Sequence, residues 1–234
     1  MPLPLLAVNT RPAEPPEALT PEGGPRRRPL WFRLLQGATL VAVAGLLALL
    51  AWRLVAKNRG AELVGAIGKG RTPAAPAFDL PVIWPRAETW PPPLRRALGD
   101  GRIALGELRG YPLVINFWAS WCIPCKAEAP ALAASARAHA GKVAFLGIDV
   151  QDLTSDARRF LRRHGANYVS VRDGGNSVYS AYGLTGVPET YYLDRRGRIV
   201  AHSLGQLSRD ELEQGIARAL GGWRRPGSQA AKSP

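Results

Sequence analysis

The chain has little cysteine and histidine for its 234 residues, and this scarcity limits the metal sites that it could build. It contains two cysteines, Cys122 and Cys125, and three histidines, which are His139, His164 and His202. A structural zinc site needs four ligands, and these histidines do not repeat the close spacing that such sites use. We therefore expect neither a metal ion nor another cofactor.

The sequence also lacks the basic blocks interleaved with aromatic residues that are typical of nucleic-acid surfaces. Its net charge is +13. Residues 1–72 contribute +6 (ten Lys/Arg against four acids), and the longer remainder contributes +7 (21 against 14). This distribution favours a solvated basic surface together with positive flanks around a membrane segment. We therefore expect no nucleic-acid partner.

A long apolar run extends from Leu34 to Trp52. As a helix, its 19 residues would measure about 28 Å, which is close to the roughly 30 Å hydrocarbon thickness of a bilayer. Trp31 and Trp52 bracket the run, as interfacial aromatic residues commonly do. Because Arg53 follows where a signal-peptide cleavage site would need small residues, we predict an uncleaved transmembrane anchor.

The anchor separates regions of different composition. We predict a disordered tail over 1–29, the anchor over 30–56, a tether over 57–76, a folded domain over 77–221 and a flexible tail over 222–234. The arginine cluster at 26–28 precedes the apolar run, and positive residues favour the cytoplasmic side of a membrane. We therefore expect a single-pass protein of the cell membrane, with a cytoplasmic N-terminus and the folded domain in the periplasm.

The two cysteines lie at the junction of a predicted strand and a predicted helix. Residues 113–118 are rich in β-branched and aromatic types, which favours a buried strand, and the alanine-rich segment 126–140 favours a helix. A cysteine at a helix N-terminus within a Cys-X-X-Cys pair has a lowered thiol pKa. We therefore predict that Cys122 is an exposed nucleophile and that Cys125 resolves its mixed disulfide. A purely structural disulfide would constrain little, because the loop is so short.

The rest of the folded domain alternates strand and helix signals. We expect strands at 78–80, 102–105, 142–150, 168–171, 190–193 and 198–203, and helices at 155–164 and 208–220. The second of these helices begins with a capping box, Ser208-x-x-Glu211. Residues 81–101, rich in proline and tryptophan, would form a structured loop or a surface that faces a partner. This order of elements predicts an α/β sandwich.

Two motifs resemble those of thioredoxin. Residues 117–126, FWASWCIPCK, resemble its active site, and residues 186–190, GVPET, resemble the cis-proline loop that faces it. With the anchor, the helix at 155–164 and Glu128, the chain resembles more narrowly the membrane-tethered thiol-disulfide oxidoreductases of the CcmG/DsbE, ResA and TlpA group. The resemblance implies a thioredoxin-like α/β fold, with a central mixed sheet flanked by helices.

The resemblance also implies which residues meet the substrate. Trp121 and Pro124 would lie beside the cysteines. A cis peptide bond between Val187 and Pro188 would expose backbone, so that an extended client could pair with it like an added strand.

One position departs from the thioredoxin pattern. Thioredoxins carry a buried aspartate six residues before the first cysteine, and this chain has Asn116 there. An amide cannot accept the proton of the resolving thiol. Glu128, Glu189 or water would then accept it.

The function that the resemblance implies is reduction of apocytochrome c during cytochrome c maturation, with electrons from a membrane donor of the CcdA/DsbD type. Two alternatives stay open. One is a TlpA-like reductase with broader clients, such as proteins with copper sites. The other is a chaperone that binds Cu(I) through the two soft thiolates. A peroxidase is less favoured, because nothing beyond the cysteine pair suggests a peroxide pocket.

Overall fold

The computed structural model describes the backbone of residues 30–221 and the side chains of residues 34–52 and 60–221. The predicted tails, 1–29 and 222–234, lie outside the described residues. The chain divides into two compact units, Met1–Ala48 and Leu49–Pro234.

The segment predicted as an anchor is helical throughout. Helix α1 spans Leu30–Gly68 and contains Leu34–Trp52, whose side chains are all exposed. This segment is long and apolar enough to cross a membrane.

The predicted tether, residues 57–76, is wrong over its first part because α1 continues to Gly68. Leu63 and Ile67 lie four residues apart, on one face of the helix, and both pack against the core of the second unit. The packing of this apolar stripe stabilises the helix beyond the polar residues that follow the anchor. Ala74 then bridges to Arg198.

A seven-stranded mixed sheet forms the centre of the second unit, in the order β2-β1-β5-β4-β3-β6-β7. β3, β4 and β5 are parallel, whereas the other neighbouring strands pair in antiparallel fashion. The strands are β1 (Asp79–Trp84), β2 (Arg102–Ala104), β3 (Leu113–Trp118), β4 (Ala144–Val150), β5 (Val169–Asp173), β6 (Glu189–Leu193) and β7 (Ile199–Leu204). The predicted strands are present, with shifts of one or two residues at their ends, except that β1 continues to Trp84, well into the segment 81–101 for which no strand was predicted.

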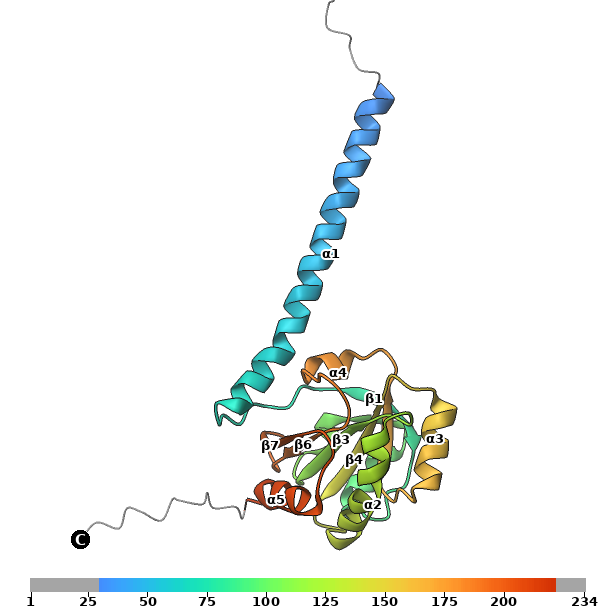
Figure 1. Cartoon of the computed structure of the whole chain (residues 1–234), viewed down its shortest axis with the longest axis vertical. Coiled ribbons are helices and arrows are strands. Elements are labelled where there is room, and N and C mark those ends of the chain that lie inside the picture. Colours follow the sequence, from blue (N-terminus) through green and yellow to red (C-terminus); the bar gives the residue numbers. More distant parts are fainter. Residues whose placement is uncertain (1–29, 222–234) are drawn as a thin grey trace, which may run out of the picture. The chain divides into compact units, whose positions relative to one another are not determined.

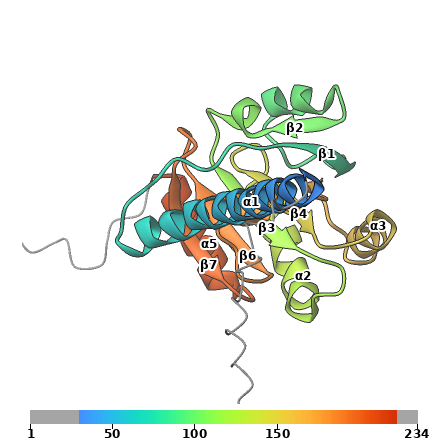
Figure 2. The ribbon, with the colours of Figure 1, turned by 90° about the horizontal axis from the view of Figure 1, so that it is seen from above.

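Helices cover the two faces of this sheet (Figure 1). One face packs against α2 (Ile123–Ala138), α3 (Thr154–Arg163) and α5 (Arg209–Ala219). The other packs against α4 (Ser177–Ala181) and the 3-10 helices η1 (Pro92–Leu98) and η2 (Leu105–Leu108). Figure 2 shows β2 and the 3-10 helices at one side of the sheet. The predicted mixed sheet flanked by helices is confirmed, and the short helix α4 is an addition to the predicted elements.

β3 supplies side chains to two separate cores, because successive residues of a strand point to opposite faces. Ile115 and Phe117 belong to the core on the α4 side, and Val114 and Trp118 belong to the core on the α2 side. Asn116 shares the alternation of Val114 and Trp118. Its amide therefore lies on the face that α2 covers.

The proline- and tryptophan-rich segment 81–101 is largely structural. Trp90 is fully buried, and its indole N–H donates a hydrogen bond to the Phe145 carbonyl at 2.7 Å. Trp84 ends β1, and its indole N–H donates to the Ala166 carbonyl at 2.9 Å. Both tryptophans are thus fixed by hydrogen bonds within the fold, and the segment is not a single loop, because it contains the end of β1 and the 3-10 helix η1.

Candidate active site

The cysteine pair stands where β3 gives way to α2. Cys122 is the N-cap residue of α2, and its Sγ accepts a hydrogen bond from the Cys125 backbone N–H at 3.1 Å. The two residues form a disulfide, with their Cα atoms 5.3 Å apart. The predicted strand-to-helix position is confirmed.

The prediction that Cys122 is exposed is wrong for the disulfide form. Cys122 is 3% exposed and Cys125 is 2% exposed, so both are buried. The cause is the loop before β6, whose Val187 carbonyl oxygen lies 3.6 Å from the Cys122 sulfur. The Val187–Pro188 peptide bond is cis, as predicted, and the loop thus faces the disulfide.

Apolar surface surrounds the buried disulfide. Trp121 is 54% exposed, and its indole N–H donates a hydrogen bond to the Gln151 carbonyl at 3.0 Å. Ile123 is also exposed, and Pro124 is half-buried in the first turn of α2. The structure therefore brings the predicted substrate-binding residues on both sides of the disulfide together.

Glu128 lies one turn after Cys125 on α2 and is only 1% exposed. Its Oε1 accepts a hydrogen bond from the Asn116 amide at 2.8 Å, and its Oε2 accepts one from the Leu207 backbone N–H at 2.9 Å. Burial raises the pKa of Glu128 to about 7, although both hydrogen bonds act in the opposite direction. A carboxyl group with this pKa exchanges a proton readily at neutral pH.

Glu189 lies on the opposite face of the sheet. It shares the alternation of Tyr191 on β6, and its Oε2 pairs with His202 Nε2 at 2.9 Å. Its Oε1 accepts hydrogen bonds from the backbone N–H groups of Thr185 at 3.0 Å and Gly186 at 3.4 Å. Burial alone would raise the pKa of Glu189, but these partners together lower it below its ordinary value. Glu189 therefore holds the loop that leads to Pro188, and the sheet separates it from the face with Glu128.

Three residues around these carboxyl groups were not singled out from the sequence. Leu207 and His202 are direct partners of Glu128 and Glu189, respectively, and Thr190 accepts a hydrogen bond through its hydroxyl from Asn116 at 3.0 Å. Asn116 and Thr190 are cross-strand partners on β3 and β6. Aligning the two predicted strands could have revealed that pair, whereas Leu207 lies in a loop with no local signal.

Near the cysteines, hydrogen bonds join the loop after β3 to the loop after β4. The Asp152 carboxylate accepts hydrogen bonds from the Ser120 backbone N–H at 2.5 Å and from the Ser120 hydroxyl at 2.9 Å. Arg172 donates to the Asp152 backbone carbonyl and pairs with the Asp149 carboxylate at 2.9 Å. This network fixes the segment that precedes Cys122.

Within the described part of the chain, no group of three or more His, Cys, Asp or Glu residues could hold a metal ion.

The chain is similar to known proteins. Residues 73–202 match the AhpC/TSA family. The chain is 34% identical over 126 residues to the thiol:disulfide interchange protein HelX of Rhodobacter capsulatus, covering 53% of this chain and 65% of HelX. It is 32% identical over 142 residues to the thiol:disulfide interchange protein DsbE of Pseudomonas fluorescens, covering 58% and 70%. The chain thus spans about two thirds of the length of these relatives.

A solved structure supports the same grouping. The structure of a putative thiol:disulfide interchange protein DsbE from Chlorobium tepidum aligns with a TM-score of 0.52 and 27% identity. The alignment covers 64% of this chain and 97% of the Chlorobium chain. The predicted thioredoxin-like fold and the predicted resemblance to the DsbE and ResA group are confirmed. Because residues 73–202 make up more than half of the 234 and include the cysteine pair and the cis-proline loop, the chain belongs to the AhpC/TSA family of thioredoxin-like proteins.

Proposed function

We propose that the protein is a thiol-disulfide oxidoreductase that reduces the disulfides of client proteins outside the cytoplasm. The observation that carries the proposal is the disulfide at the N-terminus of α2, facing a cis-proline loop. Similarity to proteins named thiol:disulfide interchange proteins supports it.

The reaction begins from the reduced pair. The Cys122 thiolate attacks one sulfur of a client disulfide, so that a mixed disulfide forms and the first client thiolate leaves. Cys125 then attacks the Cys122 sulfur, which releases the second client thiolate and restores the Cys122–Cys125 disulfide. Two electrons pass from the pair to the client. The position of Cys122 at the N-cap favours its thiolate, because the Cys125 N–H points at its sulfur and the helix dipole is positive there.

The second step needs a group that accepts the Cys125 proton. We assign this task to Glu128, which lies on the same helix one turn further on and on the same side of the sheet. Hydrogen bonds from Asn116 and Leu207 hold its carboxyl group in place. Glu189 is the weaker candidate, because its partners keep it ionised on the other face.

Apocytochrome c is the client that we propose, and a membrane protein of the CcdA/DsbD type is the proposed donor that reduces the pair again. Similarity to DsbE and ResA supports both assignments. An extended segment of the client would lie along Val187 and Pro188. The apolar helix from Leu34 to Trp52 would anchor the enzyme in the membrane, with its N-terminus in the cytoplasm.

Trapping of the mixed disulfide tests this function. Without Cys125 nothing resolves the adduct, so the Cys125→Ala protein should accumulate as covalent complexes through Cys122. Mass spectrometry should find c-type apocytochromes joined through a cysteine of their Cys-X-X-Cys-His segment. Adducts with copper-site proteins alone would favour the TlpA-like alternative. The absence of any adduct in cells that express the variant would contradict the reductase function.

The proposed orientation has its own test. A periplasm-dependent reporter, such as alkaline phosphatase, fused after Arg59 should be active. Activity only of a cytoplasm-dependent reporter at the same position would overturn the orientation.

A further inference from the structure

A basic pocket of about 300 Å³ lies beside the active-site loop. Its lining includes Ser120, two residues before Cys122, and Lys126, directly after Cys125. The rest of the lining comes from α3 and the residue after it, namely Asp156, Arg159, Phe160, Arg163 and His164. The pocket thus adjoins the stretch of chain that carries the cysteine pair.

The charges in this basic pocket are unbalanced. Lys126, Arg159 and Arg163 are exposed cations, and Asp156 is the one carboxylate of the lining, paired with Arg159 at 3.2 Å. Lys126 and Arg163 have no ion-pair partner among the residues that the structure describes. Burial, together with the positive charges of Arg163 and Lys126, lowers the pKa of His164, which disfavours the protonated ring. Among the lining side chains, three cations thus face one carboxylate.

The wall of the pocket is held in place by the core. The rings of Phe160 and His164 lie 4.5 Å apart, and Phe160 also stacks on Trp118 with ring centroids 4.6 Å apart. Ser120 is held by Asp152, whose carboxylate also accepts the Leu153 N–H. The exposed cations therefore extend from a fixed base.

We propose that this pocket binds an acidic side chain of the client, close to the disulfide cysteine that Cys122 attacks. Carboxylates pair well with both arginine and lysine, and an oppositely charged partner orients the client before exchange. This inference rests on the proposed function, and it names the class of substrate: polypeptides with Asp or Glu beside the disulfide.

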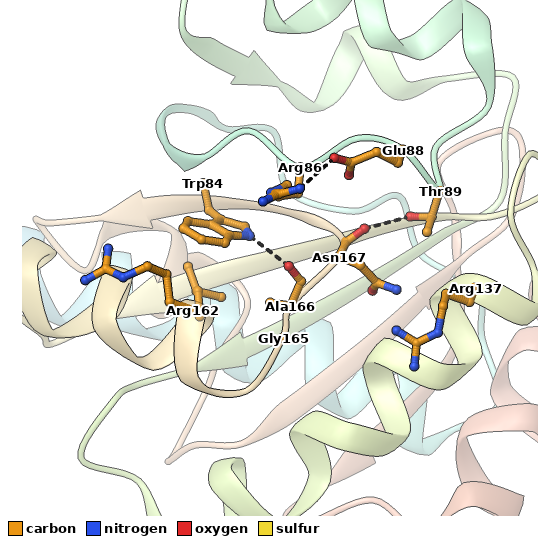
Figure 3. A pocket seen from close by; sticks show the side chains of 10 residues that line it. Trp84, Arg86, Glu88, Thr89, Arg137, Arg162, Gly165, Ala166 and Asn167 are labelled. Carbon is orange, nitrogen blue, oxygen red and sulfur yellow. Dashed lines mark hydrogen bonds and ion pairs between the residues drawn. The ribbon is translucent and has the colours of Figure 1, made fainter.

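A second basic pocket provides the comparison. Its volume is about 490 Å³, and Trp84, Arg137 and Arg162 are among the residues that line it (Figure 3). Arg137 lies twelve residues after Cys125 on α2, which corresponds to about 18 Å along the helix. Arg162 and Arg163 are adjacent arginines, both exposed, and they line different pockets. Arg162 is therefore a matched control for Arg163.

The test compares three peptides with the same intramolecular disulfide, flanked by Glu, Gln or Lys. The reduced full chain, in an uncharged detergent at low salt, should reduce them with kcat/KM in the order Glu, Gln, Lys. Each step should be about twofold to fivefold, the range of an exposed ion pair. Arg163→Gln should remove most of the preference for Glu over Gln, and Arg163→Glu should reverse it. Arg162→Gln should leave the preference unchanged.

The possible outcomes separate the pocket from the reaction. Equal reduction of the three peptides, or an equal loss of preference in the Arg162 and Arg163 variants, would overturn the pocket while the reductase function stands. Failure to reduce any peptide would contradict the reductase function. Fluorescence anisotropy of labelled peptides would then still judge the pocket, because the Glu peptide should bind more tightly than the Gln peptide, and Arg163→Gln should abolish the difference.

Discussion

Two buried glutamates on opposite faces of one sheet differ in their ionisation. Glu128 is 1% exposed and Glu189 is 3% exposed, so both are almost excluded from water. Glu128 accepts hydrogen bonds from the neutral donors Asn116 and Leu207, and its pKa rises to about 7 because of burial. Glu189 pairs with His202 and accepts two backbone N–H groups, and its pKa falls below the ordinary value despite burial.

The difference shows that burial alone does not determine what a buried carboxyl group does. Desolvation opposes ionisation at both positions, and the number and charge of the donors determine the outcome. Glu128, which has few donors, is suited to proton transfer. Glu189, which has more donors, is a fixed anion that holds the cis-proline loop.

The largest expected effect is on the pH dependence of stability. The folded-state pKa of Glu128, about 7, exceeds the ordinary value of 4.5, so the folded state binds more protons between these values. The contribution of Glu128 to the free energy of unfolding should therefore fall by on the order of 3 kcal/mol as pH rises from 4.5 to 7. Glu128→Gln should remove this fall, as measured by urea denaturation of the full chain in detergent. An unchanged pH slope in the variant would contradict the raised pKa.

The next effect is on catalysis. Glu128→Gln should slow resolution of the mixed disulfide by about a hundredfold, the lower end of what a positioned base contributes. Formation of the mixed disulfide should change little. Single-turnover kinetics separate the two steps, and the wild-type resolution rate should rise with pH around a midpoint of about 7. Glu88→Gln, at an exposed ion pair with Arg86, is the control. Unchanged resolution in both the Glu128→Gln and Glu189→Gln variants would leave water as the base.

Loss of the anion on the opposite face should reduce stability. Glu189→Gln should lower the free energy of unfolding at pH 7 by about 2 kcal/mol, as expected when a hydrogen-bonded buried charge is replaced. Because the pKa of Glu189 is lowered, its contribution is present above pH 4.5 and is lost as pH falls through the folded-state pKa. Glu88→Gln, at an exposed ion pair, should have an effect below about 0.5 kcal/mol. Equal effects of the two variants would argue against a structural anion at 189.

The smallest effect concerns the neighbour of Glu128. Asn116→Asp would place a second carboxyl group within hydrogen-bonding distance of Glu128, and two carboxylates that share a buried site raise the pKa of one of them. The pH midpoint of resolution should therefore rise by about one unit or more. Stopped-flow measurements between pH 6 and 9 would detect the shift. An unmoved midpoint would show that Glu128 does not control this step.

Local sequence was enough for the elements on which the cysteines depend. The apolar residues of β3, the alanine-rich α2 and the Cys-X-X-Cys spacing are features of one short stretch, and their strand-to-helix arrangement follows from local propensity. The GVPET motif likewise located the cis peptide bond at Pro188. The capping box at Ser208 and Glu211 correctly placed the start of α5.

Only the tertiary structure distinguished the two glutamates. The donors to Glu128 are Asn116, 12 residues away, and Leu207, 79 residues away. Sequence places both carboxylates near a motif, but a pKa depends on which groups the fold brings within a few ångströms of each oxygen. The burial of Cys122 under Val187, 65 residues later, and the continuation of α1 to Gly68 have the same cause. Each results from packing between segments that are far apart in the chain, and neither segment's sequence indicates which other segment it will contact.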